Sequence, residues 1–500
     1  MTPWACSGGS IASIVFRADR VAAVDVESKR VSHEQDRGSG TEREIGRTSR
    51  AWLGLAIVGL LLGGLLSFVL VAGRAPLLNQ LIQDPLFARR CLVIHVNLML
   101  GSWLSSFIVA FFSLTPGKER GRAPLAAAVA GVAVFVLGGF ATGAEPVLSN
   151  YVPAIDHPVF LAGIGLFGLG VAAAFLDARI LGRQAPGGSG TSRVILGLTV
   201  LGLRTAALLF VLGYATIVIC AATTPRGDRA LPYYEIVFWG GGHLFQLANV
   251  AALLSAWTVL SRVGLDTNIL SPPLARVVYG SLLVPAALLP VLLWGGTAGA
   301  RYYPGFESVM RWGTWPGAAL VIVLLLRAAR GRPRVGEGGA GGGRSLRAAA
   351  RQGLLWSVIL LLVGCALGAF IDRSTTLIPA HYHATIGAVT VSFMALTYVL
   401  LEGLGKPLPA ASLGKWAARQ PLYYGIGQVI FSLGFAYGGL HGLGRKVYGT
   451  EQVILNGHAY AGLAVMGVGG LFAMLGGGVF MVLVYRSWFA PAANRRESVL

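Results

Sequence analysis

The chain has 500 residues, of which 55% are hydrophobic and 12% are charged, and its mean hydropathy is +0.67. Charged residues make up roughly 25% of a typical soluble domain. The low share of charge excludes a soluble enzyme and predicts an all-α, polytopic membrane protein. Ionisable side chains inside a membrane are costly, so the eight histidines of this chain need individual explanations.

The net charge of +19 does not indicate a nucleic-acid-binding protein, because the basic residues lie between apolar segments and form no basic stripe on a soluble module. The four cysteines form no CxxC or CxxCH motif, which argues against a zinc ribbon, a redox dithiol and covalently attached haem. We therefore expect contact with membrane lipid and no nucleic-acid partner.

The polar residues 1–50 lack the features of a signal peptide, and we predict a disordered cytoplasmic arm there. Residues 51–485 form the predicted membrane domain, with a cytoplasmic linker at 331–350, and residues 486–500 form a cytoplasmic tail. The membrane domain contains twelve apolar segments long enough to span a bilayer. In chain order, these predicted spans lie near 51–73, 91–114, 123–144, 158–176, 194–222, 233–261, 275–299, 309–330, 353–372, 378–402, 421–444 and 457–485.

The Lys and Arg residues between the predicted spans indicate the orientation of the bundle. Alternate loops carry 29 of these residues on the side of the N-terminus and 10 on the other side. Because cytoplasmic loops carry the excess of positive charge, both termini are predicted to be cytoplasmic. The predicted location is a bacterial inner membrane, which the chain crosses many times.

Four histidines lie at similar depth in the outer half of the predicted spans: His95 in the second, His243 in the sixth, and His381 and His383 in the tenth. Residues two apart on a helix are separated by about 200° around its axis, so His381 and His383 project from nearly opposite faces. One helix could then ligate two metal centres. For any single histidine, the alternative is an interfacial or hydrogen-bonded side chain that binds no metal.

Apolar surroundings and neutral imidazoles favour noncovalently bound haem over zinc, which prefers four close ligands that often include thiolates. Two histidines from different helices give a six-coordinate haem suited to electron transfer. A single histidine leaves an axial position open for a gas. The histidine pattern therefore predicts haem sites in the outer half of the bundle.

Four motifs follow one another across almost all of residues 51–485. They are Cys-Leu-Val-Ile-His-Val-Asn-Leu-Met-Leu at 91–100, Phe-Trp-Gly-Gly-Gly-His-Leu-Phe-Gln at 238–246, Pro-Ala-His-Tyr-His-Ala-Thr at 379–385 and Gly-Leu-Gly-Arg-Lys-Val-Tyr-Gly at 442–449. Together with the twelve spans, they resemble subunit I of the haem–copper oxidase superfamily, which includes cytochrome and quinol oxidases and nitric oxide reductases. Histidine-aromatic-histidine is the most specific signature of that family.

The resemblance implies a role for each of the four histidines. His95 and His383 would be the two axial ligands of a low-spin haem. His381 would be the proximal ligand of a high-spin haem, and His243 would be the first ligand of a second metal that faces it. The implied fold is a haem–copper oxidase subunit I-like bundle of about twelve helices.

The last motif implies that Arg445 and Lys446 pair with haem propionates as charge-assisted donors, whereas the alternative is a solvated pair in an outer loop. The implied cofactors are two noncovalent haems of type b or a. The implied partners are a cytochrome c or quinol that donates electrons and additional oxidase subunits.

The sequence departs from this family at the second metal. The family's copper is held by three histidines, two of them adjacent on helix seven, but this chain has no histidine between His243 and His381. Gly295 and Gly296 stand where the pair is expected, and Leu247 stands where many oxidases have a tyrosine. One imidazole does not hold copper or non-haem iron in a useful geometry, which puts a second metal, four-electron reduction of O2 and proton pumping in doubt.

Three functions follow from these observations. The first is a membrane oxidoreductase, either a terminal oxidase or a nitric oxide reductase-like enzyme, that passes electrons to a high-spin haem binding O2 or NO. The second is a haem electron-transfer or gas-sensing membrane protein without binuclear catalysis, which the missing histidine pair favours. The third is a secondary transporter, which twelve spans also fit but which leaves the His-Tyr-His motif unexplained.

Overall fold

The structure is a computed structural model. It describes residues 46–115, 121–176, 191–330, 341–408, 411–454 and 456–490. The chain divides into two units, residues 1–48 and residues 49–500. The described residues begin at Gly46, and the second unit contains nearly all of the membrane domain.

Three segments predicted from the sequence lie partly outside the described residues: the arm 1–50, the linker 331–350 and the tail 486–500. Their described parts are helical. The first helix begins at Gly46, α12 (Gly341–Ala369) begins within the linker range, and α15 (Gly457–Phe489) ends within the tail range. Arg, Leu and Ala are strong helix formers and dominate residues 344–350, so α12 extends beyond its apolar part.

The second unit is an all-α membrane bundle of twelve helical segments in the described part of the chain. Ten of these are long and apolar enough to cross a membrane, and α4 and α14 complete the set. In chain order they are Gly46–Ala72, α2 (Pro85–Val96) continued by a π-helical stretch (Asn97–Ser105) and α3 (Ser106–Phe112), α4 (Ala123–Gly138), α5 (Pro158–Phe175), α6 (Thr191–Thr223), α7 (Ala230–Leu265), α8 (Pro272–Ala287) with α9 (Leu289–Leu293), α10 (Tyr302–Gly313) with α11 (Trp315–Arg330), α12, α13 (Leu377–Gly403), α14 (Ala411–Leu440) and α15.

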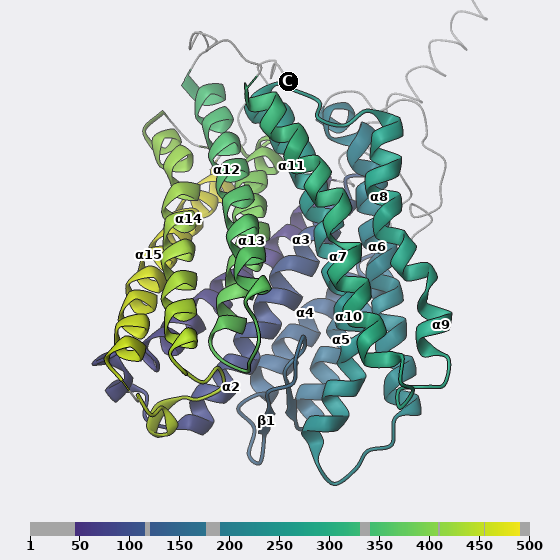
Figure 1. Ribbon diagram of the computed structural model, residues 1–500. Helices are drawn as coiled ribbons and strands as arrows, with labels where there is room; N and C mark the ends of the chain where they lie inside the picture. The colour runs from purple at the N-terminus through teal and green to yellow at the C-terminus, as the bar shows by residue number, and fades with distance from the viewer. Residues whose placement is uncertain are drawn as a thin grey trace, which may run out of the picture. The chain divides into compact units, whose positions relative to one another are not determined.

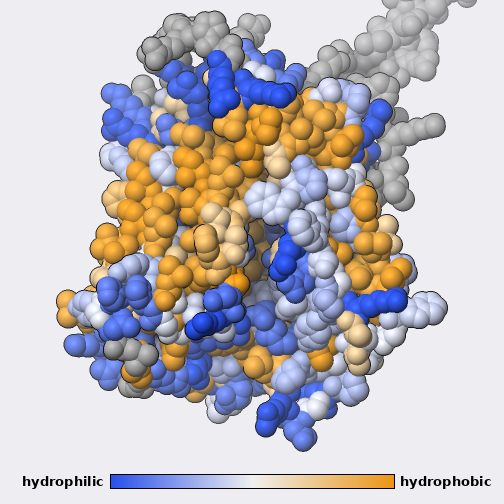
Figure 2. Space-filling model, in the orientation of Figure 1, coloured by the Kyte–Doolittle hydropathy of each residue, from blue (hydrophilic) through white to orange (hydrophobic). Residues whose placement is uncertain are grey.

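The helices form because a bilayer offers no water to backbone N–H and C=O groups, so each spanning segment must satisfy them internally. Figure 1 shows the helices running alongside one another. Figure 2 shows the apolar side chains gathered in a band across the middle of one face, with hydrophilic residues above and below it. The predicted fold class is therefore confirmed.

The seventh and eighth predicted spans differ from the structure at the ends that the loop 294–301 joins. The seventh was predicted to reach residue 299, but α9 ends at Leu293 and an exposed turn follows. Gly295 and Gly296 adopt φ values of 91° and 73° in this turn, a left-handed conformation that glycine adopts without strain and that ends a helix. The eighth begins earlier than predicted, at Tyr302.

A β-hairpin between α4 and α5 was not predicted. β1 (Glu145–Val147) pairs antiparallel with β2 (Ala154–Asp156), and the residues between them form a tight tip. The hairpin lies at the end of the bundle drawn at the bottom of Figure 1. The expected third span reached residue 144, but α4 ends at Gly138, which leaves enough chain to build the hairpin.

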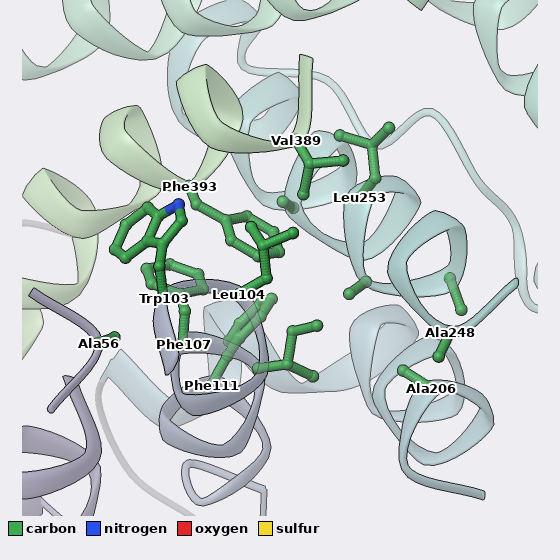
Figure 3. Close-up of a cluster of buried hydrophobic side chains, with 14 of the residues drawn as sticks. Ala56, Trp103, Leu104, Phe107, Phe111, Ala206, Ala248, Leu253, Val389 and Phe393 are labelled. Atoms are coloured by element: carbon green, nitrogen blue, oxygen red, sulfur yellow. The ribbon is translucent and has the colours of Figure 1, made fainter. Parts of the chain in front are cut away.

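α13 and α7 are the central helices, because 89% and 78% of their most apolar windows are buried. Aromatic side chains fill the space between α13 and the second span. Phe393 stacks on Phe107 with a centroid distance of 4.2 Å, and Trp103 lies 5.3 Å from Phe107 (Figure 3). In a bilayer, such close packing replaces the hydrophobic effect as the force that joins helices, so it fixes the helix that carries two of the four histidines.

Candidate functional site

α13 presents His381 and His383 to different neighbours. The Nδ1 atom of His381 lies 2.7 Å from the carbonyl oxygen of Gly364 in α12. The ring of His383 lies against α14, where its centroid is 4.7 Å from that of Phe431. The two imidazoles therefore project from different sides of one helix into different surroundings, as the spacing of two residues predicts.

His95 lies on α2, on the same side of α13 as His383. Its Nδ1 atom is 2.8 Å from the carbonyl oxygen of Gly63 in the first helix. The two imidazoles are near enough to interact electrostatically, and both line one cavity. A π-helical stretch begins two residues after His95, an irregularity that often marks functional sites.

The hydrogen bonds of His95 and His381 determine which ring nitrogen can bind a metal. A carbonyl oxygen only accepts hydrogen bonds, so Nδ1 carries the proton in both residues and Nε2 keeps its lone pair. Metal-ligating histidines characteristically donate their second ring N–H to a carbonyl or carboxylate in this way. The backbone therefore holds both imidazoles in the tautomer of a ligand.

His243 differs because both of its nitrogens are occupied. Nδ1 lies 2.7 Å from the carbonyl oxygen of Trp239, one turn earlier on α7, and Nε2 lies 2.8 Å from the hydroxyl of Tyr151 at the hairpin tip. The imidazole is completely buried. Gly242 makes room for Tyr151, since an added Cβ would lie 2.5 Å from the Cβ of that tyrosine.

Arg445 and Lys446, between α14 and α15, contact the hairpin tip. Arg445 donates a 2.9 Å hydrogen bond to Oδ1 of Asn150, and Lys446 donates one to the carbonyl oxygen of Leu148. Burial, and secondarily the charge of Arg445, lowers the pKa of Lys446 to about 8. The Nε atom of Arg445 is buried without a hydrogen-bond partner among the described residues. The pair is therefore half-buried against the hairpin and is not a fully solvated pair in a loop.

Arg74, just beyond the first helix, is a third cation at this site, and sequence reasoning missed it. Its side chain is 2% exposed and donates hydrogen bonds to the carbonyl oxygens of Gly444 (2.6 Å) and Arg445 (3.3 Å) and to Gln452 (3.2 Å). These acceptors are all neutral. Burial lowers the pKa of Arg74, since its charge lacks a carboxylate partner among the described residues. A cluster of three cations, of which Arg74 is buried and Arg445 and Lys446 are half-buried, calls for an anionic group.

Asn150 and Tyr151 were also missed. Asn150 donates from its backbone N–H and from Nδ2 to the carboxylate of Glu235, at 3.1 and 3.0 Å, while it accepts the hydrogen bond from Arg445. The hairpin tip thereby joins α7 to the loop before α15. No motif or periodicity marks these residues, because their partners lie about a hundred residues or more away in the sequence.

One cavity of about 1980 Å³ connects these groups. Small-molecule sites usually measure about 300–1,000 Å³, so this cavity has room for more than one such ligand. Its lining includes the three histidines His95, His381 and His383 and the three cations Arg74, Arg445 and Lys446. His243 is not among the lining residues, and the cavity wall beside it is formed by Tyr151, Trp239 and Gly242.

The residues fit haem and do not fit a second metal. Two ligand-type tautomers, an imidazole at His383, a large cavity and three cations on its wall are what two iron porphyrins with propionates require. By contrast, the described residues include no group of three His, Cys, Asp or Glu side chains placed to hold a metal ion. Gly295 and Gly296 lie in the exposed turn after α9, so this end of the seventh span adds no ligand to a site at His243.

Comparison with solved structures shows what this fold is. A chain of a haem–copper terminal oxidase dimer superposes with a TM-score of 0.68, at 19% sequence identity, over 91% of this chain and 85% of the other. The fold is that of a haem–copper oxidase. At this identity the likeness establishes the fold alone.

Sequence comparisons add relatives without a described activity. An uncharacterized protein of Aquifex aeolicus is 29% identical over 367 residues, which cover 71% of this chain and 84% of that protein. The uncharacterized protein RP382 of Rickettsia prowazekii is 23% identical over 508 residues, covering 88% and 96%. No family model matches the chain.

Proposed function

We propose that the protein is a haem-carrying membrane oxidoreductase that passes electrons from a bis-histidine haem to a second haem that binds O2 or NO. The observation that carries this proposal is the arrangement of α13. His383 and His95 lie near one another in one cavity, while His381 is held through Nδ1 on the other side of the helix, and no described residue is hydrogen-bonded to its Nε2. The oxidase fold supports haem ligation by this helix and disfavours a transporter.

In this proposal His95 and His383 hold one haem between α2 and α13, and His381 holds the other from one side only. Haem supplies reversible one-electron transfer at iron and, where a single histidine binds it, an open position for a gas. The hydrogen bonds of His95 to Gly63 and of His381 to Gly364 fix both rings before any ligand binds. This preorganisation raises the basicity of Nε2 and orients it.

Arg74, Arg445 and Lys446 bind the propionates in this proposal. Arg74 is buried and Arg445 and Lys446 are half-buried, and this partial exclusion of water strengthens attraction to carboxylates. The haems are noncovalent and of type b or a. The electron donor is a cytochrome c or a quinol, additional oxidase subunits are expected partners, and the chain lies in a bacterial inner membrane with both termini cytoplasmic.

A second candidate is a haem electron-transfer or gas-sensing protein without binuclear catalysis. The hydroxyl of Tyr151 on Nε2 of His243, together with the absence of a metal-ligand group among the described residues, favours it. Both candidates require haem, so purified protein expressed with adequate haem must show Soret absorption. O2 and NO consumption with a reduced cytochrome donor separates them. Turnover of O2 or NO identifies an oxidase or a nitric oxide reductase-like enzyme, and two haems without turnover identify the second candidate.

A further inference from the structure

His243 is the residue that resembles the first ligand of a second metal, yet its coordinating nitrogen is in use. Nδ1 faces the carbonyl oxygen of Trp239 at 2.7 Å and must carry the proton, so Nε2 is an acceptor. Tyr151 therefore donates its hydroxyl hydrogen to Nε2 across 2.8 Å. The lone pair that would bind copper or iron is engaged by a phenol.

The backbone of Tyr151 shows that this contact is imposed by its surroundings. Its φ of 63° lies in the left-handed region, which is uncommon and strained for a residue other than glycine. Such a conformation persists only where neighbours hold it. Here Asn150, the adjacent residue, is fixed by Glu235 and Arg445, and Lys446 holds Leu148.

The neighbours of His243 offer nothing that could displace the phenol in favour of a metal. The rings nearest to its imidazole belong to Tyr151 (4.4 Å), Trp239 (4.8 Å) and Phe306 (6.1 Å). In the described part of the chain, no three metal-binding side chains converge. A lone imidazole in an aromatic shell does not provide the geometry that copper or non-haem iron needs.

We infer that Tyr151 takes the place of the second metal, so that the gas site contains one haem iron and a hydrogen-bonded Tyr151–His243 pair. This inference rests on the proposed function, because the gas is taken to bind at the haem on His381. Tyr151 lines the same cavity as His381, and its hydroxyl hydrogen is already donated. The oxygen therefore presents lone pairs to the cavity. The site takes one diatomic molecule at a single iron, with no metal opposite it.

The first experiment is metal analysis of the purified full chain, in wild type and in His243→Ala. We expect two haem irons per chain and no stoichiometric copper or non-haem iron in either protein. One copper or non-haem iron per chain in wild type that is lost in His243→Ala overturns the inference. The copper and non-haem iron content tests the inference even in protein without Soret absorption. The lack of Soret absorption would contradict the proposed function.

The second experiment is infrared spectroscopy of the carbon monoxide adduct of the reduced protein. Tyr151→Phe keeps the ring but removes the oxygen, so the C–O stretching band should shift. His243→Ala should shift it too, and the double variant should add little, because both changes break one hydrogen bond. Tyr214→Phe is the matched control: Tyr214 also lines the cavity but is hydrogen-bonded to Ser105. It should leave the band in place.

A C–O band that is unchanged in Tyr151→Phe overturns the inference, provided that the variant retains two haems and elutes as folded protein. If Tyr151→Phe fails to fold, His243→Gln tests the inference through the haem and metal content of the protein. The side-chain amide of glutamine can keep a hydrogen bond to Tyr151 but cannot act as an imidazole ligand. Wild-type haem and metal content in His243→Gln supports the inference, and loss of a bound metal contradicts it.

Discussion

The Nδ1–H group of His381 donates a 2.7 Å hydrogen bond to the carbonyl oxygen of Gly364, and this bond joins the two helices that enclose one side of the cavity. The imidazole of His381 also packs against Gly368, one turn further along α12. A Cβ added to Gly368 would lie 2.6 Å from Nδ1 of His381. The position of this imidazole therefore depends on two small residues of α12.

Gly368→Ala should displace His381 and remove the signal of the high-spin haem while sparing the low-spin haem. The added methyl group cannot be accommodated unless the imidazole or one of the helices moves. Optical spectra of the reduced and carbon monoxide-bound protein measure the two haems separately. The control is Gly343→Ala on the same helix, where an added Cβ meets nothing within 4 Å. Retention of carbon monoxide binding in Gly368→Ala would contradict the account.

The assignment of the two histidines of α13 can be tested directly. His383→Ala should abolish the low-spin signal, and His381→Ala should spare it, because the two rings serve opposite sides of the helix. His95→Ala should behave like His383→Ala. His441→Ala is a suitable control, since its ring stacks on His458 at 4.4 Å outside the cavity wall. The reverse pattern for His381 and His383 would overturn the assignment.

Arg74→Gln should lower haem retention and the thermal stability of the protein. The change removes a buried cation and leaves carbonyl oxygens of the loop before α15 unpaired, at a cost of about 1–3 kcal/mol for each unsatisfied group. Arg89→Gln is the control, because its ion pair with Glu451 is 31% and 42% exposed and surface pairs contribute about 0–1 kcal/mol. Haem content after dialysis and thermal melting measure both effects. Equal losses in the two variants would refute a special role for Arg74.

The lowered pKa of Lys446 predicts that the stability of the haem-free protein depends on pH. Its pKa is lowered from 10.5 to about 8, so between these two values the unfolded chain holds the proton that the folded chain has lost. Where the unfolded state binds more protons, stability rises with pH, so the free energy of unfolding should increase from about pH 8 to pH 10.5. Thermal melts of wild type and Lys446→Gln isolate this contribution. A slope that is the same in both proteins contradicts it.

The sequence was sufficient for the parts of the site that depend on local geometry. Apolar length predicts the twelve helical segments, ten of which are long and apolar enough to cross a membrane, and a spacing of two residues places His381 and His383 on opposite sides of α13. It was insufficient where contacts join distant segments. Tyr151 is 92 residues from His243, and Arg74 is 370 residues from Gly444. Neither contact leaves a local pattern, because both depend on how the hairpin and the loop before α15 fold over the bundle.

The central claim is that this chain holds one haem between His95 and His383 and a second on His381. Electron paramagnetic resonance of the oxidised, purified protein tests it most directly, with total haem measured on the same sample. The account predicts two haems per chain, with one low-spin and one high-spin signal of equal intensity. Protein that binds no haem, or that shows only one type of signal at two haems per chain, would contradict it.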